Sequence, residues 1–187
     1  MSIRSLTALA IFTLAACNGG GLTMVNYIDT NPYYNPSTVS WTVVDGRFPA
    51  EVYGQPFADR TETAETIAAA ISGPSYAPPS RLTADPAAAE KRAGHRVVLV
   101  FNPSAFPSFK RLCADASAIK TAGASASVMN VHAAYCARDE VVSTGVLRAA
   151  PGKDPSDPVF HKSMQHLIEN LLPPTSPNDD GAVRTGV

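Results

Sequence analysis

The 187-residue chain lacks a strong excess of charge of either sign. Its formal net charge is −1, only 17% of its residues are charged, and no run of basic residues occurs. Phosphate backbones and anionic lipid surfaces attract proteins chiefly through clustered lysine and arginine. We therefore expect no nucleic-acid partner. The 45% of apolar residues still allow a real hydrophobic core, so global disorder is not indicated.

The chain also lacks the short motifs that announce common catalytic sites. No G-x-S-x-G, H-E-x-x-H, P-loop or G-x-G-x-x-G pattern occurs. His161 and His166 are five positions apart on an expected helix, so they point about 140° apart and cannot share a metal by themselves. His132 shares a predicted strand face with Cys136, and we expect it to be a hydrogen-bonded structural histidine. The sequence thus predicts no enzyme, cofactor or metal site.

Long apolar runs are missing, and a short one lies at the amino terminus. Arg4 precedes the apolar segment Leu6–Leu14, which is shorter than the roughly 20 residues needed to span a bilayer. Small residues then lead to a cysteine in Leu14-Ala15-Ala16-Cys17. This order resembles the signal peptide and lipobox of bacterial lipoproteins. A plain secretory signal with an incidental cysteine is the alternative.

The lipoprotein resemblance implies cleavage before Cys17 and acylation of that cysteine, which would anchor the chain to a membrane. Two or three acyl chains anchor a protein firmly, whereas one binds only marginally. Asn18 follows the lipidated position instead of an aspartate, which resembles the sorting pattern for the outer membrane, facing the periplasm. The expected divisions are a signal peptide at 1–16, a lipidated cysteine and flexible tether at 17–36, one folded domain at 37–174 and a disordered tail at 175–187.

Cysteine is scarce, with three residues in the chain. If Cys17 is acylated, Cys113 and Cys136 remain as an even pair in an oxidising compartment. We expect a disulfide between them. A redox-active or metal-binding pair is the alternative, but no C-x-x-C spacing supports it.

Hydrophobic periodicity predicts a mixture of strands and helices. Strands are expected near residues 39–43, 50–54, 95–101, 128–136 and 141–149. Helices are expected near residues 64–71 and 158–171, with shorter helical turns near 87–92 and 106–112. A capping box formed by Asp59 and Glu62 is expected to start the first helix, and Asp157 with Pro158 the last. The result is an α+β two-layer sandwich, with a mostly antiparallel sheet of about four strands and two main helices on one face.

The function that this organisation favours is non-catalytic. The mature part loosely resembles uncharacterised envelope lipoproteins of proteobacteria, through its two cysteines and the motif Asp157-Pro158-Val159-Phe160. That resemblance implies a periplasmic accessory or adaptor protein of a cell-envelope assembly. A small-molecule or lipid-binding module is one alternative. A hydrolase without a familiar motif is another, and it requires His132 or His161 beside a serine or carboxylate in a concave site. The tyrosines at 27–34 and Trp41 could bind a partner or anchor the tether to the domain.

Overall fold

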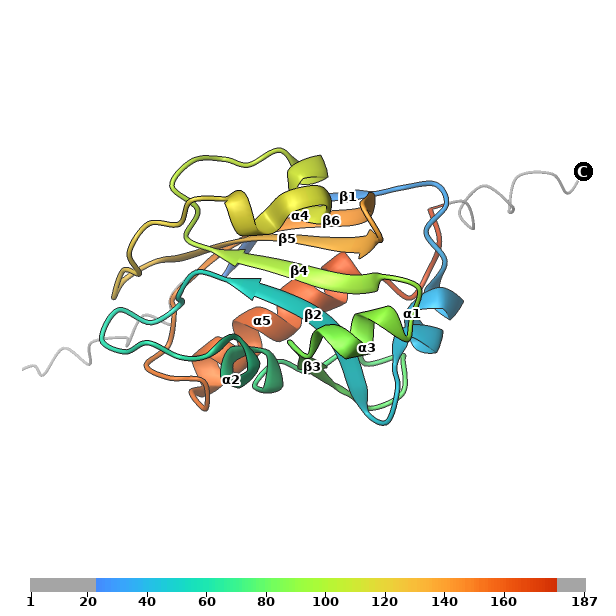
Figure 1. Cartoon of the computed structure of the whole chain (residues 1–187). Helices are drawn as coiled ribbons and strands as arrows, with labels where there is room; N and C mark the ends of the chain where they lie inside the picture. The colour runs from blue at the N-terminus through green and yellow to red at the C-terminus, as the bar shows by residue number, and fades with distance from the viewer. Residues whose placement is uncertain (1–22, 178–187) are drawn as a thin grey trace, which may run out of the picture.

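The structure is a computed structural model that describes residues 23–177 (Figure 1). Its strands are β1 (Met24–Thr30), β2 (Arg47–Tyr53), β3 (Arg81–Thr83), β4 (His95–Phe101), β5 (Met129–Ala137) and β6 (Glu140–Ala149). Its α-helices are α1 (Pro36–Thr42), α2 (Ala64–Ala69), α3 (Pro86–Glu90), α4 (Phe109–Asp115) and α5 (Pro158–Leu171). The predicted α+β class is confirmed.

The strands form a single mixed sheet in the order β1-β6-β5-β4-β2-β3. The pairs β1–β6, β6–β5 and β5–β4 are antiparallel, whereas β4–β2 and β2–β3 are parallel. The sheet is larger than the expected four or so strands, and it is mostly but not purely antiparallel. Parallel neighbours need a crossover connection, and the short helices α2 and α3 provide those connections.

The central strand β4 carries the core on both of its faces. Val97, Leu99 and Phe101 join the large cluster that includes α2 and α5, and Val98 and Val100 join a smaller cluster under α4. All five side chains have no exposed surface. A continuous apolar run in a strand is typical of burial on both faces, so this prediction is confirmed. The helix α4 on the second face makes the sandwich more than two layers.

Helix α5 forms as the sequence predicts. Asp157 caps it by accepting a hydrogen bond from the Val159 backbone N–H, and Pro158 occupies its first turn. Its apolar stripe is fully buried against the sheet. The stripe consists of Phe160, Met164, Leu167, Ile168 and Leu171. Helix α2 lies on the same face but is capped by Thr63, which accepts from the Thr66 N–H, and not by the expected Asp59.

The segment around Trp41 is helical, so the strand predicted at 39–43 was wrong. The Asn35 side chain accepts a hydrogen bond from the Ser37 N–H, and Pro36 opens helix α1. An asparagine cap followed by proline is a strong helix start. Here it overrides the alternating pattern of Val39, Trp41 and Val43. Val39 is buried while Trp41 remains 48% exposed.

The expected flexible tether at 17–36 does not hold for its second half. Residues Met24–Thr30 form β1, which pairs with β6 at one edge of the sheet. The signal peptide at 1–16, the lipidation site Cys17 and residues 178–187 of the expected tail lie outside the described residues. Within residues 23–177, no helix combines the length and the apolar character that a membrane crossing requires.

Candidate functional site

The predicted disulfide is confirmed between Cys113 in α4 and Cys136 in β5, whose Cα atoms are 5.5 Å apart. Both cysteines are buried in the smaller hydrophobic cluster. The bond ties α4 to the second face of the sheet. Because both sulfur atoms are consumed, neither cysteine is a free nucleophile or a thiolate ligand in this state.

The best-developed polar constellation is centred on His95, at the first residue of β4. His95 Nδ1 lies 3.1 Å from the hydroxyl of Tyr135, which lies 3.1 Å from Thr42 Oγ1. Thr42 in turn donates to the Thr38 carbonyl at 2.8 Å. These contacts run from the surface through the buried Tyr135 into helix α1.

The direction of these hydrogen bonds determines the tautomer of His95. Thr42 uses its proton on the Thr38 carbonyl, so it accepts from Tyr135, and Tyr135 accepts from His95 Nδ1–H. Burial raises the pKa of Tyr135 to about 12, which keeps that hydroxyl protonated. Burial and the Arg138 charge lower the pKa of His95. His95 is therefore neutral at pH 7, with its lone pair on Nε2.

Trp41 and Arg92 stand beside this histidine. The Trp41 and His95 rings meet edge-to-face with centroids 6.0 Å apart. The Arg92 guanidinium carbon lies 4.8 Å from the centroid of the indole ring, a cation–π arrangement. Arg92 also donates to the Val43 carbonyl at 3.4 Å, and its Nε is buried without a partner among the described residues. The indole is therefore held in place while half of it faces solvent.

Two strained turns frame the histidine. Ala93 and Arg138 have positive φ angles of 53° and 55°, and Gly94 has a φ of 78°. The Arg138 N–H donates to the Gly94 carbonyl at 3.0 Å, which joins the turns before β4 and after β5. Left-handed residues other than glycine are uncommon and cluster at functional sites.

Arg96 fastens these turns to the disulfide-bonded helix. Its guanidinium donates to the carbonyl oxygens of Gly94, Arg138 and Cys113, at 3.2, 2.8 and 2.8 Å. It also pairs with Glu51 at 2.5 Å. One mostly buried cation thus connects both turns, helix α4 and strand β2.

An open hollow of about 540 Å³ lies next to these turns, with His95, Arg138, Asp139 and Glu140 among its lining residues. We call Trp41, Arg92, His95, Arg138, Asp139 and Glu140 together the His95 surface. It combines an exposed aromatic ring, two guanidinium groups, two carboxylates and a neutral imidazole. Such a surface offers packing, charge pairing and a hydrogen-bond acceptor to a bound molecule.

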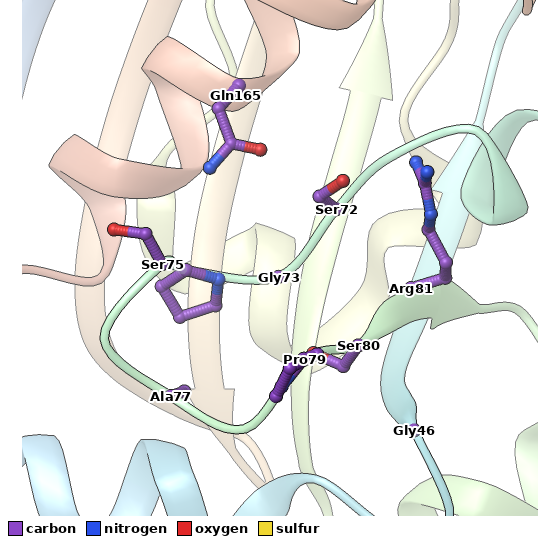
Figure 2. A pocket seen from close by; sticks show the side chains of 10 residues that line it. Gly46, Ser72, Gly73, Ser75, Ala77, Pro79, Ser80, Arg81 and Gln165 are labelled. Atoms are coloured by element: carbon purple, nitrogen blue, oxygen red, sulfur yellow. The ribbon is translucent and has the colours of Figure 1, made fainter.

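A second hollow, of about 560 Å³, lies between α5 and the loop before β3 (Figure 2). Ser72, Ser80 and Arg81 line one side of it, and Gln165 projects from α5 on the other. The Ser80 hydroxyl is buried without a partner in the described part of the chain, packed against Gly73. Its lining contains no histidine or carboxylate, so it offers hydrogen bonds but no acid–base pair.

The histidines singled out from the sequence are not assembled into a catalytic group. His132 is buried, but its Nδ1 has no hydrogen-bond partner among residues 23–177. The expectation that His132 is a hydrogen-bonded structural histidine was therefore wrong for this atom. His161 shares a hollow of about 430 Å³ with Ser72 and Ser156. Its Nε2 bonds to the Pro155 carbonyl at 2.6 Å, while the Ser156 hydroxyl donates to Asp154. In the part of the chain that the structure describes, no three His, Cys, Asp or Glu residues could hold a metal together.

Of the tyrosines before α1, Tyr34 takes the anchoring role. Tyr34 is buried and donates from its hydroxyl to the Pro173 carbonyl at 2.6 Å, with the Tyr76 hydroxyl 2.9 Å away. It anchors the segment before α1 to the domain. Tyr33 is 91% exposed and makes no such anchoring contact. The Tyr27 side chain lies outside what the structure describes.

Sequence reasoning did not identify the His95 surface. Its members come from three separate segments, and His95 resembled only the start of a core strand. The usable signals were the two short turns, Lys91-Arg92-Ala93-Gly94 and Arg138-Asp139, which flank adjacent strands. No protein-family model matches the chain, and the searches found no similar curated protein and no similar solved structure.

Proposed function

We propose that the chain is a membrane-tethered accessory lipoprotein of a cell-envelope assembly, which binds a protein partner through the His95 surface. The observation that carries the binding role is Trp41, half exposed and held between Arg92 and His95. Tryptophan and arginine are enriched among the residues that dominate binding energy at protein interfaces. The tether and the location rest on the lipobox at Leu14–Cys17.

The rigidity of the surface supports recognition of a preformed partner. Gly94 and Arg138 are bonded to each other and to Arg96, and the His95 ring is fixed by Tyr135. Fewer side chains then have to be ordered on binding, which lowers the entropic cost. Nothing in this role requires a covalent step, which agrees with the proposal of a non-catalytic protein.

A binding module for a small polar molecule is the second candidate, and the hollow in Figure 2 favours it. The side chains of Ser72, Arg81 and Gln165 line it and offer hydrogen bonds to a ligand rich in hydroxyl or carbonyl groups. The hollow is open, however, and ligand sites generally enclose most of the ligand surface. The His95 surface therefore supports the first candidate better.

The partner proposal is tested by crosslinking cells that express the chain at its native level, followed by affinity purification from detergent-solubilised membranes. We expect a specific adduct with the wild type and loss of that adduct with Trp41→Ala. Tyr33→Ala is the matched control, because it removes another exposed aromatic ring outside the His95 surface. Recovery of the wild-type protein alone, or equal adducts from both variants, would contradict the proposal.

The tether is tested separately by metabolic labelling with palmitate. The wild type should be labelled and Cys17→Ser should not. Persistent labelling of the serine variant would show that Cys17 is not the lipidated residue.

A further inference from the structure

The end of the sheet where the described chain begins exposes several apolar side chains. Met24 opens β1, lies opposite Arg148 of β6 and is 47% exposed. Phe106, 68% exposed, lies in the loop that follows β4 at the same end, and Val159, 44% exposed, lies in the first turn of α5. We call Met24, Phe106 and Val159, with the exposed cations Arg148 and Lys162, the Met24 end.

Helix α5 brings its first turns next to the start of β1. The Thr23 hydroxyl lies 3.2 Å from the Ser163 hydroxyl, which is one helical turn beyond Val159. The ring contact between Phe101 and Phe160 places the amino terminus of α5 at the same end as the last residue of β4. In Figure 1 the arrowhead of β4 and the first turn of α5 both lie toward the left of the molecule.

The chain between Cys17 and this end is short. Thr23 follows Cys17 by six residues, and six extended residues span at most about 22 Å. A domain of this size has a radius of gyration of about 15 Å, and therefore a diameter well above that span. A lipid on Cys17 would consequently hold the Met24 end beside the bilayer, and it excludes an inverted orientation in which the opposite end alone touches the bilayer.

We infer that the Met24 end rests on the phospholipid bilayer. Its apolar side chains would enter the interfacial layer, and Arg148 and Lys162 would face the lipid phosphates. The His95 surface lies at the other end of the sheet, because His95 pairs with Ala137, where β5 turns into β6. It would therefore point away from the membrane, toward a partner. This inference rests on the proposed lipidation of Cys17.

Trp41 makes a direct test possible, because it is the only tryptophan in the chain and belongs to the His95 surface. The processed, lipidated protein is inserted into vesicles of phosphatidylethanolamine and phosphatidylglycerol that contain brominated phosphatidylcholine, which quenches tryptophan fluorescence within the bilayer. We expect wild-type Trp41 to keep its emission. The double variants Trp41→Phe/Phe106→Trp and Trp41→Phe/Val159→Trp should each lose most of theirs. Both positions that receive the tryptophan are exposed, so the fold should tolerate these substitutions.

Co-sedimentation with the vesicles and intact mass are measured on the same samples. Quenching of Trp41 would overturn the orientation and leave the tether intact. Undiminished emission from both double variants would do the same, provided that the protein carries the lipid mass and sediments with the vesicles. A dimer in detergent with both moved tryptophans unquenched would assign this end to a second copy of the chain, and would also overturn it. Protein without the lipid mass that stays in the supernatant refutes the tether and the orientation together.

Discussion

Gly94 is the residue on which the geometry of the His95 surface depends most directly. Its φ is 78°, and a Cβ added there would lie 3.0 Å from Arg138 Cγ and 3.2 Å from Arg138 Cα. We predict that Gly94→Ala lowers the free energy of unfolding by about 1–2 kcal/mol, the cost of a left-handed conformation for a residue with a Cβ. It should also weaken partner crosslinking. Gly123→Ala is the control, because nothing lies within 4 Å of the added atom, and urea denaturation measures both.

His132 should make the stability of the domain depend on pH. Burial lowers the pKa of its imidazole below the ordinary value of 6.5. Below pH 6.5 the His132 imidazole is protonated in the unfolded chain but stays neutral in the folded chain. This histidine therefore lowers the free energy of unfolding progressively as the pH falls from 6.5 toward the pKa of His132 in the folded protein. His95 acts in the same direction.

Replacing His132 by leucine removes that contribution. Between pH 7 and pH 5, His132→Leu should lose less unfolding free energy than the wild type, as measured by urea denaturation. His166→Gln, which removes an exposed histidine from α5, should follow the wild-type curve. Parallel curves for His132→Leu and the wild type would contradict this prediction.

Among the elements, α4 depends on its disulfide more than on its own length. It has seven residues, and isolated helices this short are unstable in water. The bridge spans 23 positions, and closing such a loop stabilises a fold by about 3 kcal/mol in the chain-entropy model. Cys113→Ser should therefore lower the unfolding free energy by about that amount. Oxidised wild type should also migrate faster than reduced protein on a non-reducing gel, and the variant should show no such difference.

The elements that sequence reasoning predicted correctly are those whose signals are strong and local. The β4 run and the capped, amphipathic α5 each contain enough apolar residues at one period to define their type. The failures were α1, β1 and the three-residue strand β3, which no expected strand covered. In α1, alternating residues outweighed the Asn35-Pro36 start in our interpretation. In β1, glycine, proline and tyrosine nearby suggested a tether, although the strand itself is stabilised by pairing with β6, a partner more than 100 residues away.

For the whole molecule, α5 is the longest helix described, and it packs on one face of the sheet. Burial of its apolar stripe should decide whether the domain folds. Leu167 has no exposed surface. A carboxylate there would be buried without a partner, so Leu167→Asp should cost more than about 4 kcal/mol and unfold the domain. His166→Asp is the matched control, because the neighbouring side chain is exposed on the same helix. Thermal unfolding followed by circular dichroism distinguishes the two, and an unchanged midpoint for Leu167→Asp would mean that α5 is not part of the core.

The molecule has two chemically different ends. One end carries Met24, Phe106 and Val159 near the start of the described chain, and the other carries the His95 surface. The composition does not indicate this division, because the net charge of −1 and the aromatic content describe both ends together. Only the strand order and directions place His95, at the start of β4, and Met24, at the start of β1, at opposite ends of the same sheet.

The sequence alone determined what depends on neighbours in the chain: the central strand, the last helix and its cap. It also allowed the cysteine pair to be predicted by counting. The tertiary structure decided which distant segments meet. The mixed sheet order, the chain of hydroxyls from His95 to Thr42 and the contact of Arg92 with Trp41 all join residues from separate elements. Local periodicity carries no information about such contacts, because they arise from the packing of the whole domain.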